Sequence, residues 1–76
     1  MKWTKLEYGK WPEGDIVMRI KDDKGEIWYQ VGIISQHLKD KEWYFYLNSA
    51  FPSKVSIDSI YDTEPHYIKL NEIQLP

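Results

Sequence analysis

The chain has 76 residues, of which 42% are hydrophobic, 29% charged and 16% aromatic, and its formal net charge is −2. A chain of this length buries roughly 60% of the surface that it exposes when unfolded. We therefore expect one domain over residues 1–76, with a single thin core and no room for a deep catalytic cleft. The absence of cysteine excludes a disulfide framework and a thiolate metal site.

The first clear β-strand is expected at residues 15–21. There Ile16, Met18 and Ile20 alternate with other residues, which is the period-2 pattern of a half-buried strand. The sequence Asp22-Asp23-Lys24-Gly25 follows and predicts a tight hairpin loop, because Gly25 readily adopts a positive φ. Residues 3–11, before the Pro12-Glu13-Gly14 turn, are predicted to be irregular.

Residues 26–36 fit two periodicities. Ile27, Val31 and Ile34 have helical spacing, whereas Ile27, Tyr29 and Val31 also alternate as in a strand. The stretch is rich in β-branched and aromatic residues, and Gly32 would weaken a helix interior by about 1 kcal/mol. We therefore favour a strand. Gly32 within it predicts a bulge or a point where another chain segment approaches closely.

The second half of the chain predicts three more strands. Residues 38–42 form a charged turn, and residues 43–47 are five consecutive β-favouring residues. Residues 55–58 predict a short strand that runs into a helical turn, and residues 66–70 a last strand. Five strands joined by short turns predict an all-β fold with one short helical turn. We expect a small antiparallel meander curled into an SH3-like barrel or roll, since curling protects its edges.

The twelve aromatic rings are the unusual feature of the composition, and half of them fall at positions 28–29 and 43–46. One face of these two strands must form the core. On the other face, Trp28, Tyr44 and Tyr46 would form an exposed platform, if the hairpin register places them together. The alternative is that the rings fill the core of a small domain. Because Tyr and Trp are enriched at interface hot spots, a platform favours a protein partner over a base or a sugar.

The C-terminal third is acidic, since residues 55–76 carry a net charge of −3. This part of the chain contains residue types that bind metals, namely Asp58, Asp62, Glu64 and His66. Their spacing, however, matches no calcium-binding loop. We interpret them as a solvated acidic loop, expect no metal, and add Asp62 and Glu64 to the candidate partner-binding residues. The sequence also has no Gly-rich phosphate loop and no nucleophile elbow. We therefore expect no catalytic residues, no cofactor and no enzymatic activity.

Several short motifs, spread over nearly the whole chain, resemble those of a known protein family. They are Trp3, Pro12-Glu13-Gly14 followed by Ile16-Val17, Gly32, Trp43-Tyr44, His66-Tyr67 and Leu75-Pro76. In this order the sequence resembles a family of short phage and prophage proteins of unknown function. It departs from the family at Pro65, at Tyr67 and in the lack of prolines at 68–70. The resemblance implies a small accessory protein of a phage or mobile element, without known catalytic residues.

These observations favour a small non-enzymatic interaction module that binds and modulates a host or phage protein. Inhibition of a host protein, as in counter-defence, is the specific form that the resemblance implies. No apolar leader or membrane-spanning run is present, so we expect a cytoplasmic protein without membrane contact. An open sheet edge would also allow a homodimer.

The alternative function is a single-stranded nucleic-acid binder that stacks bases on the aromatic platform. Its basic rim would be Lys2, Lys5, Lys10, Arg19, Lys21 and Lys24. Phosphate binding draws on clustered Lys and Arg, and the sequence has no such cluster, so nucleic acid is disfavoured as a partner. A third hypothesis is a small enzyme centred on His66, or a saccharide binder.

Overall fold

The computed structural model describes residues 2–49 and 53–72, so the Leu75-Pro76 motif lies outside the described residues. Strands dominate, as the alternating sequence patterns predict. The elements in chain order are β1 (Thr4–Lys5), β2 (Ile16–Lys21), β3 (Ile27–Gln36), β4 (Trp43–Leu47), β5 (Ser53–Ser56), α1 (Ile57–Tyr61), β6 (His66–Lys69) and the 3-10 turn η1 (Leu70–Glu72).

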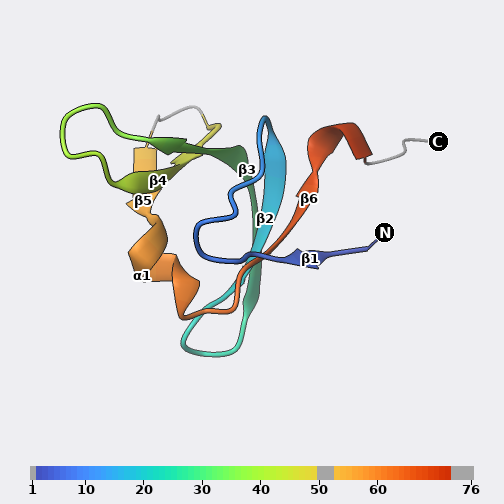
Figure 1. Ribbon diagram of the computed structural model, residues 1–76. Coiled ribbons are helices and arrows are strands. Elements are labelled where there is room, and N and C mark those ends of the chain that lie inside the picture. The colour runs from blue at the N-terminus through green and yellow to red at the C-terminus, as the bar shows by residue number, and fades with distance from the viewer. Residues whose placement is uncertain (1, 50–52, 73–76) are drawn as a thin grey trace.

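The strands form one antiparallel sheet in the order β1-β6-β2-β3-β4-β5. β2 to β5 are successive hairpins, as expected for a meander. α1 then carries the chain back across the molecule, and β6 pairs with β2 rather than with β5 (Figure 1). The predicted all-β fold with one short helix is therefore confirmed. The sheet curls but is not closed, because its outer strands β1 and β5 do not pair with each other, so a barrel or roll describes it only loosely.

Two segments differ from the prediction by more than one residue. β1, which pairs with β6, lies in the stretch predicted to be irregular, because two residues are too short to show an alternating pattern. The strand predicted at 55–58 starts at Ser53 and gives way to α1 at Ile57. Ile57 and Ile60, three residues apart, lie on the same side of this helical turn, where Ile57 is buried and Ile60 packs against the core.

β3 is bent along its length (Figure 1), and Gly32 lies where its pairing changes from β2 to β4. The first part of β3 pairs with β2 as far as Gly32, and the second part pairs with β4 from Gly32 onward. A Cβ atom at Gly32 would overlap the carbonyl oxygen of Tyr46 and would lie 2.9 Å from ring atoms of Phe45. The predicted close approach at Gly32 is therefore confirmed, and it explains why the strand carries a glycine there.

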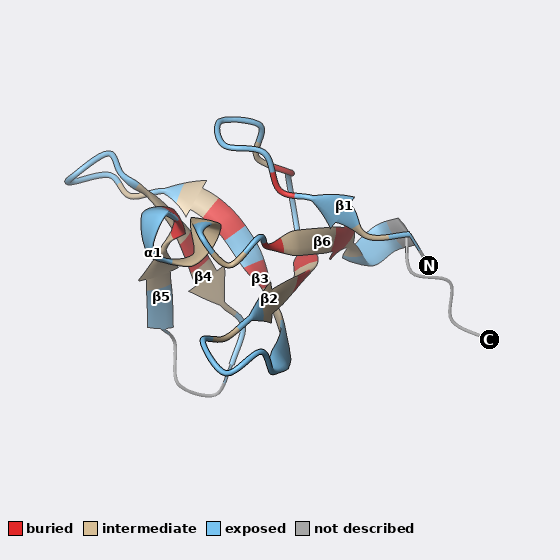
Figure 2. Cartoon of the chain, turned by 90° about the horizontal axis from the view of Figure 1, so that it is seen from below, coloured by how far each residue is buried: buried red, intermediate tan, exposed pale blue. Residues whose placement is uncertain are grey.

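The core lies on the inner face of the curled sheet (Figure 2). Its buried side chains come from the alternating positions of the strands, from α1 and from the N-terminal segment. They are Leu6, Ile16, Met18, Ile34, Phe45 and Ile57. Leu6 is held in place by its backbone N–H, which donates to the carbonyl of Pro65 at 2.9 Å. The N-terminal segment thus closes one end of the core.

Candidate functional site

The strand registers separate the three rings of the predicted platform. Trp28 is opposite Ile20 of β2, so it lies on the inner, core face of the sheet. Tyr44 and Tyr46 flank the buried Phe45 in β4, so they lie on the outer face. The expected platform of Trp28, Tyr44 and Tyr46 is therefore wrong. The β3–β4 register places Phe45, rather than the two tyrosines, on the face that Trp28 shares.

Trp28 is exposed but held in a fixed position. Its indole Nε1 donates a hydrogen bond of 2.9 Å to Oδ2 of Asp22 in the preceding hairpin loop. The other oxygen of Asp22 accepts from the backbone N–H groups of Lys24 (2.9 Å) and Glu26 (2.8 Å). The Asp22 carboxylate therefore joins the hairpin loop to the indole. Chiefly because of the Trp28 hydrogen bond, and also because of these backbone amides, the pKa of Asp22 is lowered.

Trp28 lies at an apolar cleft on the inner face, with a volume of about 200 Å³. Strands β2 and β3 form one side of it, and β4, β5 and α1 form the other. The lining residues are Met18, Ile20, Trp28, Tyr29, Gln30, Phe45, Leu47, Val55 and Ile60. A cavity of roughly 150 Å³ lined by such side chains accepts a group the size of benzene. The cleft is thus suited to one large apolar side chain.

The first part of β3 also exposes three large hydrophobic side chains in a row. Ile27 is 53% exposed, Trp28 56% and Tyr29 59%. In Figure 2 this end of β3 and the hairpin loop before it are coloured as exposed. Because side chains alternate along a strand, Ile27 and Tyr29 lie on the outer face and Trp28 on the inner face. An exposed apolar surface therefore wraps around this end of β3.

The outer-face tyrosines belong to a different environment, in the strand that follows the turn at residues 37–42. The hydroxyl of Tyr44 donates to Oδ2 of Asp40 at 2.6 Å, and its ring lies 5.7 Å from that of His37. Lys54 places its ammonium 4.9 Å from the ring centroid of Tyr44. The hydrogen bond raises the pKa of Tyr44 and lowers that of Asp40. Tyr44 is therefore engaged within the protein.

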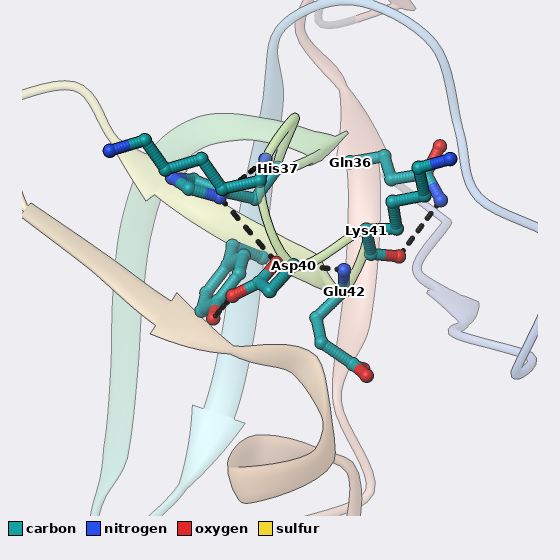
Figure 3. Close-up of polar contacts among 7 residues, drawn as sticks. Gln36, His37, Asp40, Lys41 and Glu42 are labelled. Carbon is teal, nitrogen blue, oxygen red and sulfur yellow. Dashed lines mark hydrogen bonds and ion pairs between the residues drawn. The ribbon is translucent and has the colours of Figure 1, made fainter.

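Asp40 organises this turn. Its Oδ1 accepts from the N–H of Glu42 at 2.9 Å and lies 3.5 Å from Nδ1 of His37 (Figure 3). Tyr46, the neighbouring outer-face ring, lies 6.2 Å from Tyr44 and is half-buried. These contacts stabilise the β3–β4 hairpin, and they leave less of the two tyrosines free for a partner than the sequence suggests.

The acidic candidates lie after α1. Asp62 ends the helix, and Glu64 has a positive φ of 53° with its carbonyl oxygen 2.8 Å from Nδ1 of His66. Both are exposed. Glu64 borders a hollow shared with Ile20 and Ile27, so the structure brings it to the Trp28 end of the molecule and not to Tyr44. Over residues 2–49 and 53–72, no three His, Asp or Glu side chains gather as metal ligands.

Of the residues that line the cleft, only Trp28 was a candidate binding residue from the sequence, and the walls across from it, which include Leu47, Val55 and Ile60, were not expected to form a site. The alternation in β2 assigns Ile20 to the core face, but it does not reveal that the core ends before Ile20. Val55 reaches the cleft because β5 pairs with β4, where Val55 lies opposite Phe45, and Ile60 reaches it because α1 follows directly after β5. The signal that pointed to this region was Trp28, an aromatic residue next to a hairpin loop.

The basic rim of the nucleic-acid hypothesis is partly occupied. The ammonium of Lys10 pairs with Glu7 at 3.2 Å, and the guanidinium of Arg19 lies 4.9 Å from the ring centroid of Trp3. The tyrosine platform that would stack bases is not formed with Trp28. No observation in the described structure therefore favours nucleic-acid binding over protein binding.

Comparisons with protein-family models, with curated proteins and with solved structures found no match to this chain. The resemblance to short phage proteins therefore stays a prediction. None of the helices in the described part of the chain has the length and apolar character needed to cross a bilayer.

Proposed function

We propose that the protein is a non-enzymatic interaction module that binds a partner protein at the cleft beside Trp28. The observation that carries the proposal is the combination of an exposed indole, fixed by Asp22, with an apolar cleft that it borders. Trp is the residue most typical of binding hot spots, and a fixed ring loses little conformational entropy when a partner covers it.

The chemistry of the cleft favours an apolar protein segment over other ligands. A volume of about 200 Å³ is below the roughly 300–1,000 Å³ typical of small-molecule sites. The lining residues are mostly apolar, and none of those described is a charged residue that would hold a phosphate. An apolar side chain of a partner protein is the ligand that these walls fit best.

A host protein is the partner that the resemblance to phage proteins suggests, and inhibition of that protein is the specific form of the proposal. Asp62 and Glu64 are exposed acidic residues, and Glu64 borders a hollow with Ile20 and Ile27, so these carboxylates would contact the partner at the margin of the interface. The outer-face rings Tyr44 and Tyr46 are assigned to the stability of the β3–β4 hairpin.

The test is capture of partners from a host lysate on immobilised protein, followed by calorimetry with the purified partner. Trp28→Ala should weaken binding at least roughly 30-fold, the effect of a hot spot worth about 2 kcal/mol. The matched control is the Tyr44→Ala/Tyr46→Ala double variant, which alters the opposite face and should bind within about threefold of wild type. Equal binding by the Trp28→Ala variant, or loss of binding only in the control, would refute the proposal.

A further inference from the structure

The hydrogen-bond pattern of β3 shows which of its backbone groups are free. The N–H of Asp22 donates to the carbonyl of Glu26 at 2.8 Å, and the strand register continues from this pair. Because bonded and non-bonded pairs alternate in an antiparallel ladder, Trp28 and Gln30 also turn their backbone groups toward β2. The backbone groups of Ile27 and Tyr29 point away from β2. They point to the side of β3 on which β4 pairs from Gly32 onward.

β4 does not reach this part of β3. The carbonyl of Val31 accepts from the N–H of Asn48 at 2.9 Å, just past the end of β4 at Leu47. Within the part of the chain that the structure describes, no group pairs with the backbone N–H or C=O of Ile27 or Tyr29. Among the residues that the structure describes, no strand therefore lies beside this part of β3 on the side of β4, which leaves a gap in the sheet beside Trp28.

The cleft lies on the inner side of this gap. Its walls are Trp28 and Gln30 of β3 and, across from them, Leu47, Val55 and Ile60. A residue opposite Trp28 in an added strand would share the face of Trp28, because directly opposite residues in a sheet point to the same side. Its side chain would therefore enter the cleft, while its neighbours would cover Ile27 and Tyr29 on the outer face.

We propose, building on the proposed function, that the partner segment is an extended strand that adds to β3 at Ile27–Tyr29. The free N–H and C=O groups of Ile27 and Tyr29 bind its backbone, and one large apolar side chain opposite Trp28 fills the cleft. This is recognition by strand addition, in which the backbone supplies affinity and the pocket supplies selectivity.

The exposed area argues against a second copy of this chain as the occupant. Ile27, Trp28 and Tyr29 are each a little over half exposed, so together they offer on the order of 300–400 Å². A stable protein–protein contact buries about 800 Å² on each partner. An extended segment fills the cleft as well as the edge.

The experiment selects binders from a displayed library of random 12-residue peptides on the whole protein. The best peptide is then measured by calorimetry against Ile27→Pro and Ile27→Ala. Both variants lose the isoleucine side chain, but only proline removes the free N–H. Ile27 is the first residue of β3 and its N–H points away from β2, so proline is tolerated there. We expect alternating apolar positions in the selected peptides and binding about tenfold weaker to Ile27→Pro than to Ile27→Ala.

A second measurement leaves the protein unchanged, in case Ile27→Pro fails to fold. The peptide is N-methylated on one amide at a time, and methylation of the alternate amides that face β3 should weaken binding about tenfold, whereas the amides between them should tolerate it.

Equal tolerance at all positions, or helical spacing of the apolar residues, would overturn strand addition and leave the proposed function standing. Absence of peptides sensitive to Trp28→Ala would overturn both. If the protein forms a dimer without any peptide, and Ile27→Pro abolishes this dimer, the edge binds a second copy of the chain. That result would also overturn the inference.

Discussion

The two parts of β3, before and after Gly32, have the same strand character but opposite surroundings. After Gly32, the strand pairs with β4, and Ile34 is buried under the N-terminal segment, where Trp11 packs 5.8 Å from Trp43. Before Gly32, the strand pairs with β2 alone, and its large side chains are exposed. One end of the curled sheet is closed by the chain itself, and the other is open.

This difference indicates where a small domain places its aromatic surplus. At the closed end, the rings of Tyr61, Tyr8, Trp11 and Trp43 form a chain of contacts with centroids 5.1–5.8 Å apart. Such contacts stabilise a core that a short chain cannot otherwise complete. At the open end, Trp28 is anchored by one hydrogen bond and covers little of the core. The rings at the closed end therefore pack on one another, Tyr8 among them although it is 56% exposed, whereas Trp28 at the open end is equally exposed beside the cleft.

The largest expected effect is at Gly32, where the two parts meet. Gly32→Ala places a methyl group against the carbonyl of Tyr46 and the ring of Phe45, and neither backbone nor buried ring can move away easily. We expect a loss of at least about 3 kcal/mol in the free energy of unfolding, which urea denaturation would measure. Wild-type stability in this variant would show that the bend of β3 does not need glycine.

Trp11→Ala tests the closed end. It removes a half-buried ring that packs on Trp43 and Tyr8, so we expect a loss of about 2–3 kcal/mol in the free energy of unfolding. Peptide binding at the cleft should be unchanged in the folded variant, since Trp11 does not line it. A loss of binding without a loss of stability would reverse the roles that we assign to the two ends.

Trp28→Ala is the matching change at the open end. Because the indole is mostly exposed, we expect a loss below about 1 kcal/mol in the free energy of unfolding, measured under the same denaturation conditions. Partner binding should fall as described above. A destabilisation as large as that of Trp11→Ala would mean that Trp28 is a core residue.

The smallest effect is on the titration of Asp22. Since its pKa is lowered in the folded protein, its contribution to hairpin stability is present above the unfolded-state pKa of about 4 and is lost as the pH falls through the folded-state value. In NMR titrations, Trp28→Phe should return the pKa of Asp22 toward its usual value, because the indole donor is gone. An unchanged pKa in this variant would show that the backbone amides alone hold the carboxylate.

Much of the fold follows from local patterns in the sequence. The alternation at residues 16–20, the turn residues 22–25 and the β-favouring run at 43–47 each predict an element that the structure contains. The pairing of β6 with β2 was not predictable from these patterns, because it depends on how α1 redirects the chain. β1 was not predicted because a strand of two residues is too short to show alternating hydrophobic and polar positions.

The candidate site was predictable only in part. Trp28 was identified from its residue type, but its grouping with Tyr44 and Tyr46 failed because the face of a residue depends on register, and register depends on the six-residue turn between β3 and β4. A shift of one residue in that pairing would have moved every ring of β4 to the other face. The cleft itself depends on β4 ending at Leu47, which no residue in the run 43–47 signals.

The most direct test of the open edge is amide hydrogen exchange along β3, measured by NMR on the free protein at low concentration. We expect an alternating pattern before Gly32: slow exchange at Trp28 and Gln30, whose N–H groups face β2, and fast exchange at Ile27 and Tyr29. Addition of the selected peptide should slow Ile27 and Tyr29 and leave the others unchanged. Slow exchange at Ile27 and Tyr29 in the free monomer would contradict the claim that this edge is open.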